Sequence, residues 1–446
     1  MKKTDTVLIL THPRDEGDVE TLEILSTMET RLDEDGQNAV FREFDGKALR
    51  AMPKAAPRTS IAYFPNRLPD NLKALIARIR KHYGDAADMT LIGVLPAKTA
   101  PEITALFDTA LFSPAHPAQI TMRIKALQRL ASMQDELKLR RSTHFNAFNI
   151  APPPANDARL RPPKILFVGK PAPEFMTIIH ALQEKSAEVV AAFTSFTAFD
   201  YLHEQDFDAV VLAAFESQEP ALTITATMRR NSKLYHTPTL MLSKSKKGAN
   251  AGRAYEMGVN DILISGAPTE EISGRILELA NYHRAHDQMK TDFGAIGGAA
   301  CLDAATGLYN AAFIGAHFEN HCNAQTAPLS MAVFKVIGAK GKTLSPEQIR
   351  IAAPQIGTML RSLVRVEDCA ARLAPDSFAV LFPGESAKNA QIAADRIGEI
   401  IACTGFDGAE KTFTVLLENN VVETTLAQTR IDAQKKIKDA LTQKTA

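Results

Sequence analysis

Short runs of consecutive apolar residues recur along the first two thirds of the chain, and most are followed by a segment long enough for a helix. Val7–Leu10 opens one series of such runs and Ile165–Val168 opens a second. The first series continues at Ser60–Phe64, Met89–Leu95 and Ala110–Phe112. The second series continues at Val189–Phe193, Ala209–Ala214, Thr239–Leu242 and Ile262–Ile264. Apolar strands separated by helix-length segments are typical of a parallel sheet that helices cover on both faces. The pattern therefore predicts two tandem, doubly wound α/β domains.

Prolines and glycines mark where these domains should end. Pro152–Pro154 and Pro162–Pro163 cannot continue a helix and are typical of a stiff spacer. A predicted helix from Thr269 to about Asp292 closes the second series, and three glycines follow it closely. We therefore predict a first domain over residues 1–140, a proline-rich linker over 141–163, a second domain over 164–294 and a third over 295–446.

The third domain has a different order of elements. The predicted order is helix, strand, helix, hairpin, helix and strand. After the first helix these elements cover Leu329–Ile337, Glu347–Val366, Arg372–Phe382, Asn389–Ala402 and Thr412–Leu417. The turn of the hairpin is expected at Ala374–Ser377, where Pro375 and Asp376 favour a turn.

Composition narrows the classes of function. Lys and Arg number 51, as do Asp and Glu, so the formal net charge is zero and gives no footprint for binding duplex nucleic acid. No apolar run approaches the ~20 residues that a membrane helix needs, and the start of the chain lacks a signal-peptide core. The four cysteines are too widely spaced to suggest a zinc site or a disulfide framework. We therefore expect a cytoplasmic protein.

Two separated motifs of the third domain point to a known family. Leu302–Asn310 resembles the opening D-x-L-T-G-L-x-N motif of GGDEF domains, the diguanylate cyclase family, and Arg372–Gly384 resembles the hairpin of that family. The two upstream domains resemble receiver domains of two-component systems, which have a flavodoxin-like fold. Two receivers before a GGDEF domain is the layout of the PleD and PopA group of bacterial response regulators.

The resemblance also implies that the cyclase site has lost its chemistry. The family uses two glycines, so that the hairpin backbone can approach a nucleotide, and acidic residues that hold magnesium. Here the glycine positions are Ala374 and Pro375, and of the acidic pair only Asp376 remains, because Ser377 occupies the second position. No Asp or Glu occurs from 324 to 346, where another metal ligand is expected. We therefore expect no cyclase activity, no catalytic residue and no requirement for Mg²⁺ or another cofactor.

A second site of the family is retained. Family members often carry an R-x-x-D motif five residues before the hairpin, where the product cyclic di-GMP binds. Arg365 and Asp368 match this motif at that spacing, and Arg396 matches a further arginine on the following helix. Guanidinium groups can bind guanine O6 and N7 or cyclic phosphates, and a carboxylate accepts from guanine N1 and N2. The plainer alternative is an exposed Arg–Asp pair of little energetic value.

The second receiver-like domain lacks the groups that take phosphate. Its phosphoacceptor position, at the end of the third strand, is Ala213. Gly169 and Lys170 replace the acidic pair, and Ser265 replaces the lysine, whereas Ser243 keeps a hydroxyl. An alanine cannot form an acyl phosphate, so we predict no phosphoacceptor in this domain.

The first receiver-like domain is degenerate in the same way. Thr11 and His12 replace the acidic pair, and the acceptor position falls at Phe64 or Pro65, while the lysine position falls at Ser113–Pro114. A shifted alignment would instead bring a nearby carboxylate to the acceptor position. The candidates for that role are Asp15, Glu16 and Asp70.

Two other patterns have simpler interpretations. His317 and His321 are four residues apart, a spacing that places two imidazoles on one helix face for zinc, but the sequence shows no third ligand. We expect two solvated histidines and no metal. The lysine clusters at 244–247 and 435–438 are typical of solvated loop and helix faces.

The sequence as a whole predicts a catalytically inactive, cyclic di-GMP-binding effector or adaptor of the response-regulator type. The resemblance implies protein partners that dock on the receivers, and a homodimer that forms through the face of helix 4, strand 5 and helix 5. Those partners would be bacterial cell-cycle or proteolysis factors, and the location would be the cytoplasm or the cell pole. The alternatives are an active diguanylate cyclase, which joins two GTP molecules, and a protein scaffold that binds no nucleotide.

Overall fold

The computed structural model describes residues 3–12, 18–43, 53, 56–83, 89–151, 161–244, 250–324, 328–407 and 412–424. These residues form two compact units. The first contains the described residues from 3 to 130 and from 161 to 288, and the second contains those from 131 to 151 and from 289 to 424. Across the described segments, no helix combines the length and the apolar character needed to cross a membrane.

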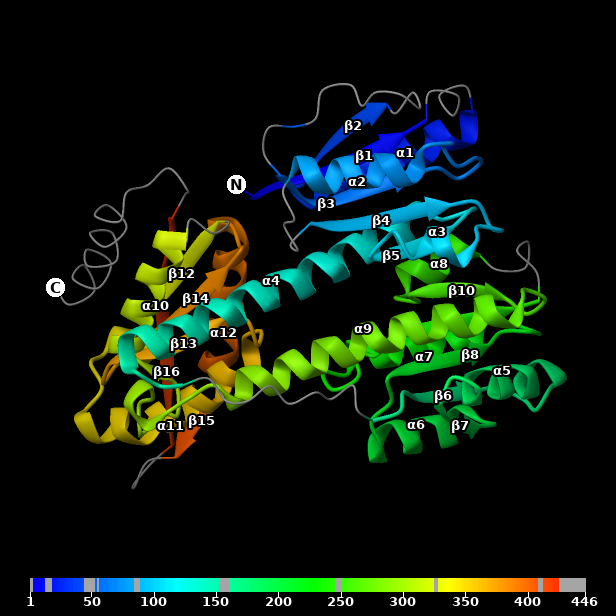
Figure 1. The fold of residues 1–446 in the computed structure, drawn as a ribbon. Helices are drawn as coiled ribbons and strands as arrows, with labels where there is room; N and C mark the ends of the chain where they lie inside the picture. Colours follow the sequence, from blue (N-terminus) through cyan, green and yellow to red (C-terminus); the bar gives the residue numbers. More distant parts are fainter. Residues whose placement is uncertain are drawn as a thin grey trace. The chain divides into compact units, whose positions relative to one another are not determined.

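The first unit begins with a parallel five-stranded sheet in the order β2-β1-β3-β4-β5 (Figure 1). Its elements are β1 (Lys3–Thr11), α1 (Val19–Glu34), β2 (Asn38–Glu43), β3 (Ala56–Tyr63), α2 (Leu72–His82), β4 (Thr90–Leu95), α3 (Pro101–Thr104), β5 (Thr109–Phe112) and α4 (Pro117–Phe148). Val7–Leu10 is completely buried, since helices cover both faces of the sheet. The predicted strands are confirmed, but the edge strand β2, whose residues are all at least partly exposed, was missed.

A second parallel sheet repeats this topology, in the order β10-β9-β8-β6-β7. Its elements are β6 (Lys164–Val168), α5 (Pro173–Gln183), β7 (Glu188–Ala192), α6 (Ser195–Glu204), β8 (Ala209–Ala213), α7 (Glu219–Arg230), β9 (Thr239–Ser243), α8 (Ala251–Glu256), β10 (Asp261–Ile264) and α9 (Thr269–Ala295). Both sheets have the 2-1-3-4-5 order of flavodoxin-like domains, including receivers. The predicted doubly wound architecture is therefore confirmed twice.

The two receiver-like domains contact each other within the first unit. The ring of His116 stacks on Tyr255 of α8 at 5.2 Å between centroids. Gln119 of α4 donates to Asp261 of β10 at 2.7 Å. These contacts place α8 and β10 of the second domain against the first domain of the same chain. The face expected to mediate dimerisation is therefore partly covered in the second domain.

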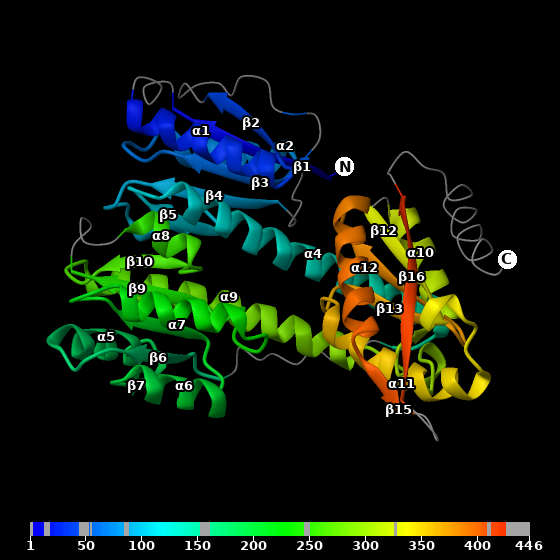
Figure 2. The ribbon, with the colours of Figure 1, turned by 180° about the vertical axis from the view of Figure 1, so that it is seen from behind.

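The second unit contains a six-stranded mixed sheet in the order β11-β13-β14-β12-β16-β15. Its elements are η3 (Ala299–Cys301), β11 (Tyr309–Asn310), α10 (Ala311–Ala324), β12 (Leu329–Gly338), η4 (Ala339–Gly341), α11 (Pro346–Leu363), β13 (Cys369–Ala374), β14 (Ser377–Pro383), α12 (Ala387–Ala402), β15 (Gly405–Asp407) and β16 (Thr412–Thr424). Ala332 and Phe334 of β12 pack with α11 and α12, whereas Met331 and Val333 pack with α10. Figure 2 shows α12 beside β16.

One predicted boundary needs correction. The linker was expected over residues 141–163, but α4 continues as a helix to Phe148. Residues 131–148 of this helix belong to the second unit, with the third domain. The prolines at 152–154 lie outside the described residues, so only residues 141–151 and 161–163 of the linker can be compared. A helix therefore occupies about the first third of the segment that composition marked as a spacer.

Candidate functional site

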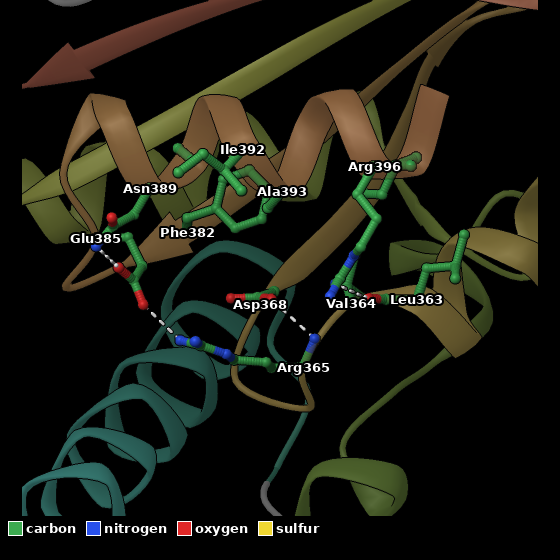
Figure 3. A pocket seen from close by; sticks show the side chains of 12 residues that line it. Leu363, Val364, Arg365, Asp368, Phe382, Glu385, Asn389, Ile392, Ala393 and Arg396 are labelled. Atoms are coloured by element: carbon green, nitrogen blue, oxygen red, sulfur yellow. Dashed lines mark hydrogen bonds and ion pairs between the residues drawn. The ribbon is translucent and has the colours of Figure 1, made fainter. Parts of the chain in front are cut away.

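A pocket of about 390 Å³ opens between the end of α11, the start of β13 and helix α12. Arg365, Asp368 and Arg396 all line it, as Figure 3 shows. We call it the arginine pocket. The apolar part of its wall includes Leu363, Val364, Phe382, Ile392 and Ala393. The structure thus brings together the three residues singled out in the sequence as a ligand site.

Local structure explains how the three residues meet. Helix α11 ends at Leu363, and the loop that follows returns the chain into β13. Within this loop the Arg365 N–H donates to Asp368 Oδ2 at 2.8 Å, and the Asp368 N–H donates to the Arg365 carbonyl at 3.1 Å. These bonds close a tight turn that carries both side chains. Arg396 reaches the pocket from the exposed side of α12, next to the buried Ile397.

The electrostatic environment of the pocket is unusual for a surface loop. Asp368 is 7% exposed, and burial, together with the neighbouring Glu367 carboxylate, raises the pKa of Asp368 to about 7. Burial opposes the charge of Arg365, but the carboxylates of Glu385 and Asp368 raise the pKa of that guanidinium above its ordinary value. The pocket therefore combines two permanent cations with a carboxyl group that ionises near neutral pH.

Oxygen atoms of the chain itself engage both guanidinium groups. Arg365 forms an ion pair with Glu385, which in turn accepts from the Asn389 side chain at 2.9 Å. Arg396 donates to the Leu363 carbonyl at 3.2 Å. Figure 3 shows the Arg365 side chain directed toward Glu385 and that of Arg396 directed toward Leu363. Sequence reasoning missed Glu385, because it lies 20 residues from Arg365 and no local pattern connects them.

The opposite end of β13 leads into the hairpin tip, which we define as Ala374–Ser377. Ala374 pairs with Ser377, so Pro375 and Asp376 form the turn that the sequence predicts. The Asp376 carboxylate forms an ion pair with Lys335 of β12 at 2.6 Å. Arg372 donates to the Pro375 carbonyl at 2.8 Å.

Lys335 is the second residue that sequence reasoning missed. It pairs with Ser377 in the β12–β14 register, one residue beyond Phe334, where a metal-binding aspartate was sought. A metal site is predicted from carboxylates, so the lysine gave no signal, although its position on β12 places it against the hairpin. An ammonium group already balances the charge of the remaining carboxylate, which opposes the binding of Mg²⁺ there. These residues do not fit a magnesium site.

The structure places the degenerate receiver positions of the second domain together. Ala213 is the last residue of β8, Gly169 and Lys170 follow β6, and all three line one pocket of about 380 Å³. A Cβ atom on Gly169 would lie 2.4 Å from the Ala213 Cβ, so the two chain segments approach closely. Lys170 forms an exposed ion pair with Glu216 at 2.9 Å. A methyl group therefore stands at the end of the strand where the resemblance places a phosphoacceptor.

The first domain shows Thr11 and Phe64, both buried, at the ends of β1 and β3. Asp70, one carboxylate that a shifted alignment would promote, has a side chain that is 88% exposed and lies 3.7 Å from Arg67. Asp15 and Glu16, the other two, lie outside the described residues, as do Ser245–Lys247 and the cluster at 435–438.

The expectation of two solvated histidines is wrong. His317 and His321 are 0% and 3% exposed, because residues 131–148 of α4 pack against α10. Glu136 of α4 supplies the third group that the sequence did not reveal: its carboxylate oxygens lie 2.8 Å from an imidazole nitrogen of each histidine. These ligand atoms lie within 4.8 Å of one another, a grouping that could hold a metal ion. However, the Arg140 guanidinium already contacts the same carboxylate at 2.6 Å, which opposes a divalent cation there.

Comparison with known proteins places this geometry in context. No family model matches the chain. The response regulator PleD of Caulobacter vibrioides is 24% identical over 199 residues, which make up 43% of this chain and 43% of PleD. The chain thus matches less than half the length of that curated relative.

Two solved structures resemble separate parts of the chain. The GGDEF domain of FimX from Pseudomonas aeruginosa is 22% identical, with a TM-score of 0.27, and the match covers 31% of this chain and 88% of that domain. The chemotaxis response regulator CheY4 of Vibrio cholerae is 19% identical, with a TM-score of 0.25, over 26% of this chain and 98% of CheY4. The fold assignment rests on the strand orders described above and not on these two matches. The chain is similar to a response regulator, and its α/β fold consists of two receiver-like domains followed by a GGDEF-like domain.

Proposed function

We propose that this chain is a cyclic di-GMP-binding effector or adaptor of the response-regulator type that has no cyclase activity. The observation that carries the proposal is the arginine pocket, because Arg365, Asp368 and Arg396 line one cavity although 31 residues separate the first from the last. A chance resemblance of sequence would not require the three side chains to meet.

The chemistry of the pocket suits a guanine nucleotide with cyclic phosphates. A guanidinium group can donate two parallel hydrogen bonds to guanine O6 and N7, and the Asp368 carboxylate can accept from guanine N1 and N2. The two arginines also supply positive charge against the two phosphates of cyclic di-GMP. To bind, the ligand replaces Glu385 at Arg365 and the Leu363 carbonyl at Arg396.

Loss of cyclase activity is supported by the contacts of the hairpin tip. Asp376 pairs with Lys335, and Pro375 occupies a turn position where the family has glycine. Phosphoryl-type transfer depends on metal ions that neutralise developing charge, and this tip offers them one carboxylate that is already paired. Ala213 likewise supports a second domain that takes no phosphate.

The output of such a protein is contact with other proteins. Ligand binding favours one arrangement of the chain and thereby changes which partners dock on the receiver-like domains. By resemblance to the family, those partners are cell-cycle and proteolysis factors, and the place of action is the cytoplasm or the cell pole.

Titration calorimetry with cyclic di-GMP tests the proposal. The wild type should bind, and Arg365→Ala should weaken binding at least about 100-fold, since a charge-assisted bidentate contact is lost. Arg350→Ala is the matched control, because Arg350 forms an exposed ion pair with Glu347 elsewhere in the same domain. Incubation with GTP and Mg²⁺ should give no cyclic di-GMP. Absence of heat in the wild type would leave only a scaffold, and turnover of GTP would favour the cyclase.

A further inference from the structure

A buried ionic cluster connects helix α4 to the third domain. Glu136 and Arg140 of α4 are 1% and 4% exposed, and their ion pair lies against His317 and His321 of α10. Although burial opposes it, the His317 and Arg140 side chains hold the pKa of Glu136 well below its ordinary value. Burial lowers the pKa of His317 to about 4, so His317 is neutral at pH 7. Glu136 therefore balances the charge of Arg140.

The Arg140 guanidinium extends beyond this cluster to the loop that carries Arg365 and Asp368. Its Nε atom donates to Glu136, while Nη1 donates to the Val366 carbonyl at 3.3 Å and Nη2 donates to the Glu367 carbonyl. Val366 and Glu367 are the two residues between Arg365 and Asp368. One side chain of α4 thus donates hydrogen bonds to the middle of the loop whose two ends line the pocket.

These hydrogen bonds depend on the shape of the Arg140 side chain. A guanidinium group is planar and presents its donors in a fixed fork, so it can bridge a carboxylate and two carbonyls at once, which an ammonium group cannot do in the same geometry. Apolar packing supports the same contact, because Val366 packs against a cluster of Met133, Leu137, Phe293 and Ile296. The loop is thus tied to α4 by polar and apolar contacts together.

We propose that Arg140 is a positioning residue for the arginine pocket and that it couples occupancy of the pocket to helix α4. The proposal rests on the proposed function, because it takes cyclic di-GMP as the ligand. Helix α4 starts at Pro117 in the first receiver-like domain and runs without interruption to Phe148. Arg140 therefore joins the ligand loop to a helix that belongs covalently to a receiver. The coupling is reciprocal: if ligand binding changes the equilibrium between two positions of α4 by some factor, a shift of α4 between them changes ligand affinity by the same factor.

Arg140→Lys is the test, with Arg141→Lys as its control. Lysine keeps the charge that Glu136 requires but loses the fork. Arg141, the next residue of α4, pairs instead with Asp292 of α9 at 3.0 Å. In calorimetry with cyclic di-GMP, Arg140→Lys should weaken binding about tenfold and Arg141→Lys less than twofold. Thermal melting of both variants shows that each is folded at the temperature of the titration.

Hydrogen exchange of the wild type gives a second readout that needs no variant. Addition of cyclic di-GMP should slow exchange of backbone amides in residues 131–148, and Arg140→Lys at saturating ligand should abolish that effect while α12 stays protected. A wild type that binds the ligand without any change in α4, or an Arg140→Lys variant of unchanged affinity, would overturn the coupling and leave the proposed function intact. A wild type that fails to bind would instead remove the proposed function.

Discussion

The two ends of strand β13 differ in how their charged groups are paired. At its start, Arg365 and Asp368 form a pocket with Arg396 in which a buried carboxyl group has a raised pKa. At its end, the hairpin tip carries Asp376, whose charge Lys335 already balances. About six residues of strand, roughly 20 Å, separate the two sites. The first end holds a buried carboxyl group beside two arginines, whereas at the second end a lysine pairs directly with the carboxylate.

Under the proposed function, ligand binding and catalysis are separated on one scaffold. A buried carboxyl group with a raised pKa lowers the stability of the fold once it ionises, so it persists where the surrounding structure holds it in place. Arg140 and the turn bonds of the Arg365–Asp368 loop enforce the pocket. At the tip, Lys335 and Ser377 already satisfy the Asp376 carboxylate.

The largest expected difference comes from the same substitution at each end of β13. Asp368→Asn should weaken cyclic di-GMP binding roughly 10- to 100-fold, because an amide replaces the charged acceptor for guanine N1 and N2. Asp376→Asn should change affinity less than about twofold, since its carboxylate contacts Lys335 and Ser377 at the hairpin tip and no residue of the arginine pocket. Calorimetry on both variants measures the contrast, and equal losses at the two positions would contradict it.

The next effect is a dependence of affinity on pH. Asp368 has a folded-state pKa of about 7 against an ordinary value of 3.8, so the unliganded fold loses stability as the pH rises between these values. A ligand that binds the ionised carboxylate releases a proton, so its dissociation constant should increase as the pH falls below 7, by at most about tenfold per pH unit.

Glu367, Arg365 and Arg140 also act on the Asp368 charge, so calorimetry in buffers of different ionisation enthalpy should count the released proton directly. Asp368→Asn should remove the pH dependence. A wild-type affinity that is flat from pH 5.5 to 8 would show that the ligand does not meet the ionised carboxylate.

A smaller effect is expected from the internal competitor. Glu385→Gln frees Arg365 from an ion pair and removes a negative charge near the ligand phosphates, so affinity should increase about two- to fivefold. Glu347→Gln, which breaks the exposed pair with Arg350, is the matched control and should leave affinity unchanged. Weaker binding by Glu385→Gln would indicate that Glu385 contacts the ligand itself.

The smallest effect is expected at the hairpin tip. Lys335→Met removes a partly exposed ion pair and should lower the free energy of unfolding by no more than about 1 kcal/mol. Binding of cyclic di-GMP should not change, and no GTP turnover should appear. Denaturant titration measures the first outcome, and a large loss of affinity would show that the two ends of β13 are not independent.

The fold was predictable wherever strands are fully buried, because a run such as Ile165–Val168 has one interpretation. The edge strand β2 was missed since its residues are half exposed and give no such run. Arg365, Asp368 and Arg396 could be named because the family motif fixes their spacing. Glu385, Lys335 and Glu136 could not, because each acts on a residue distant in the chain. The burial of His317 depends on packing by α4, which no periodicity within α10 reveals.

The contact between the two receiver-like domains has a consequence for how the protein responds to its own abundance. Because Tyr255 and Asp261 meet residues of the same chain, the link is intramolecular, and its effective concentration is set by the tether between the domains. Dilution cannot separate such a pair. Association of receivers in separate subunits depends on the concentration of the protein. Here the two receiver-like domains belong to one chain, so their association does not depend on that concentration.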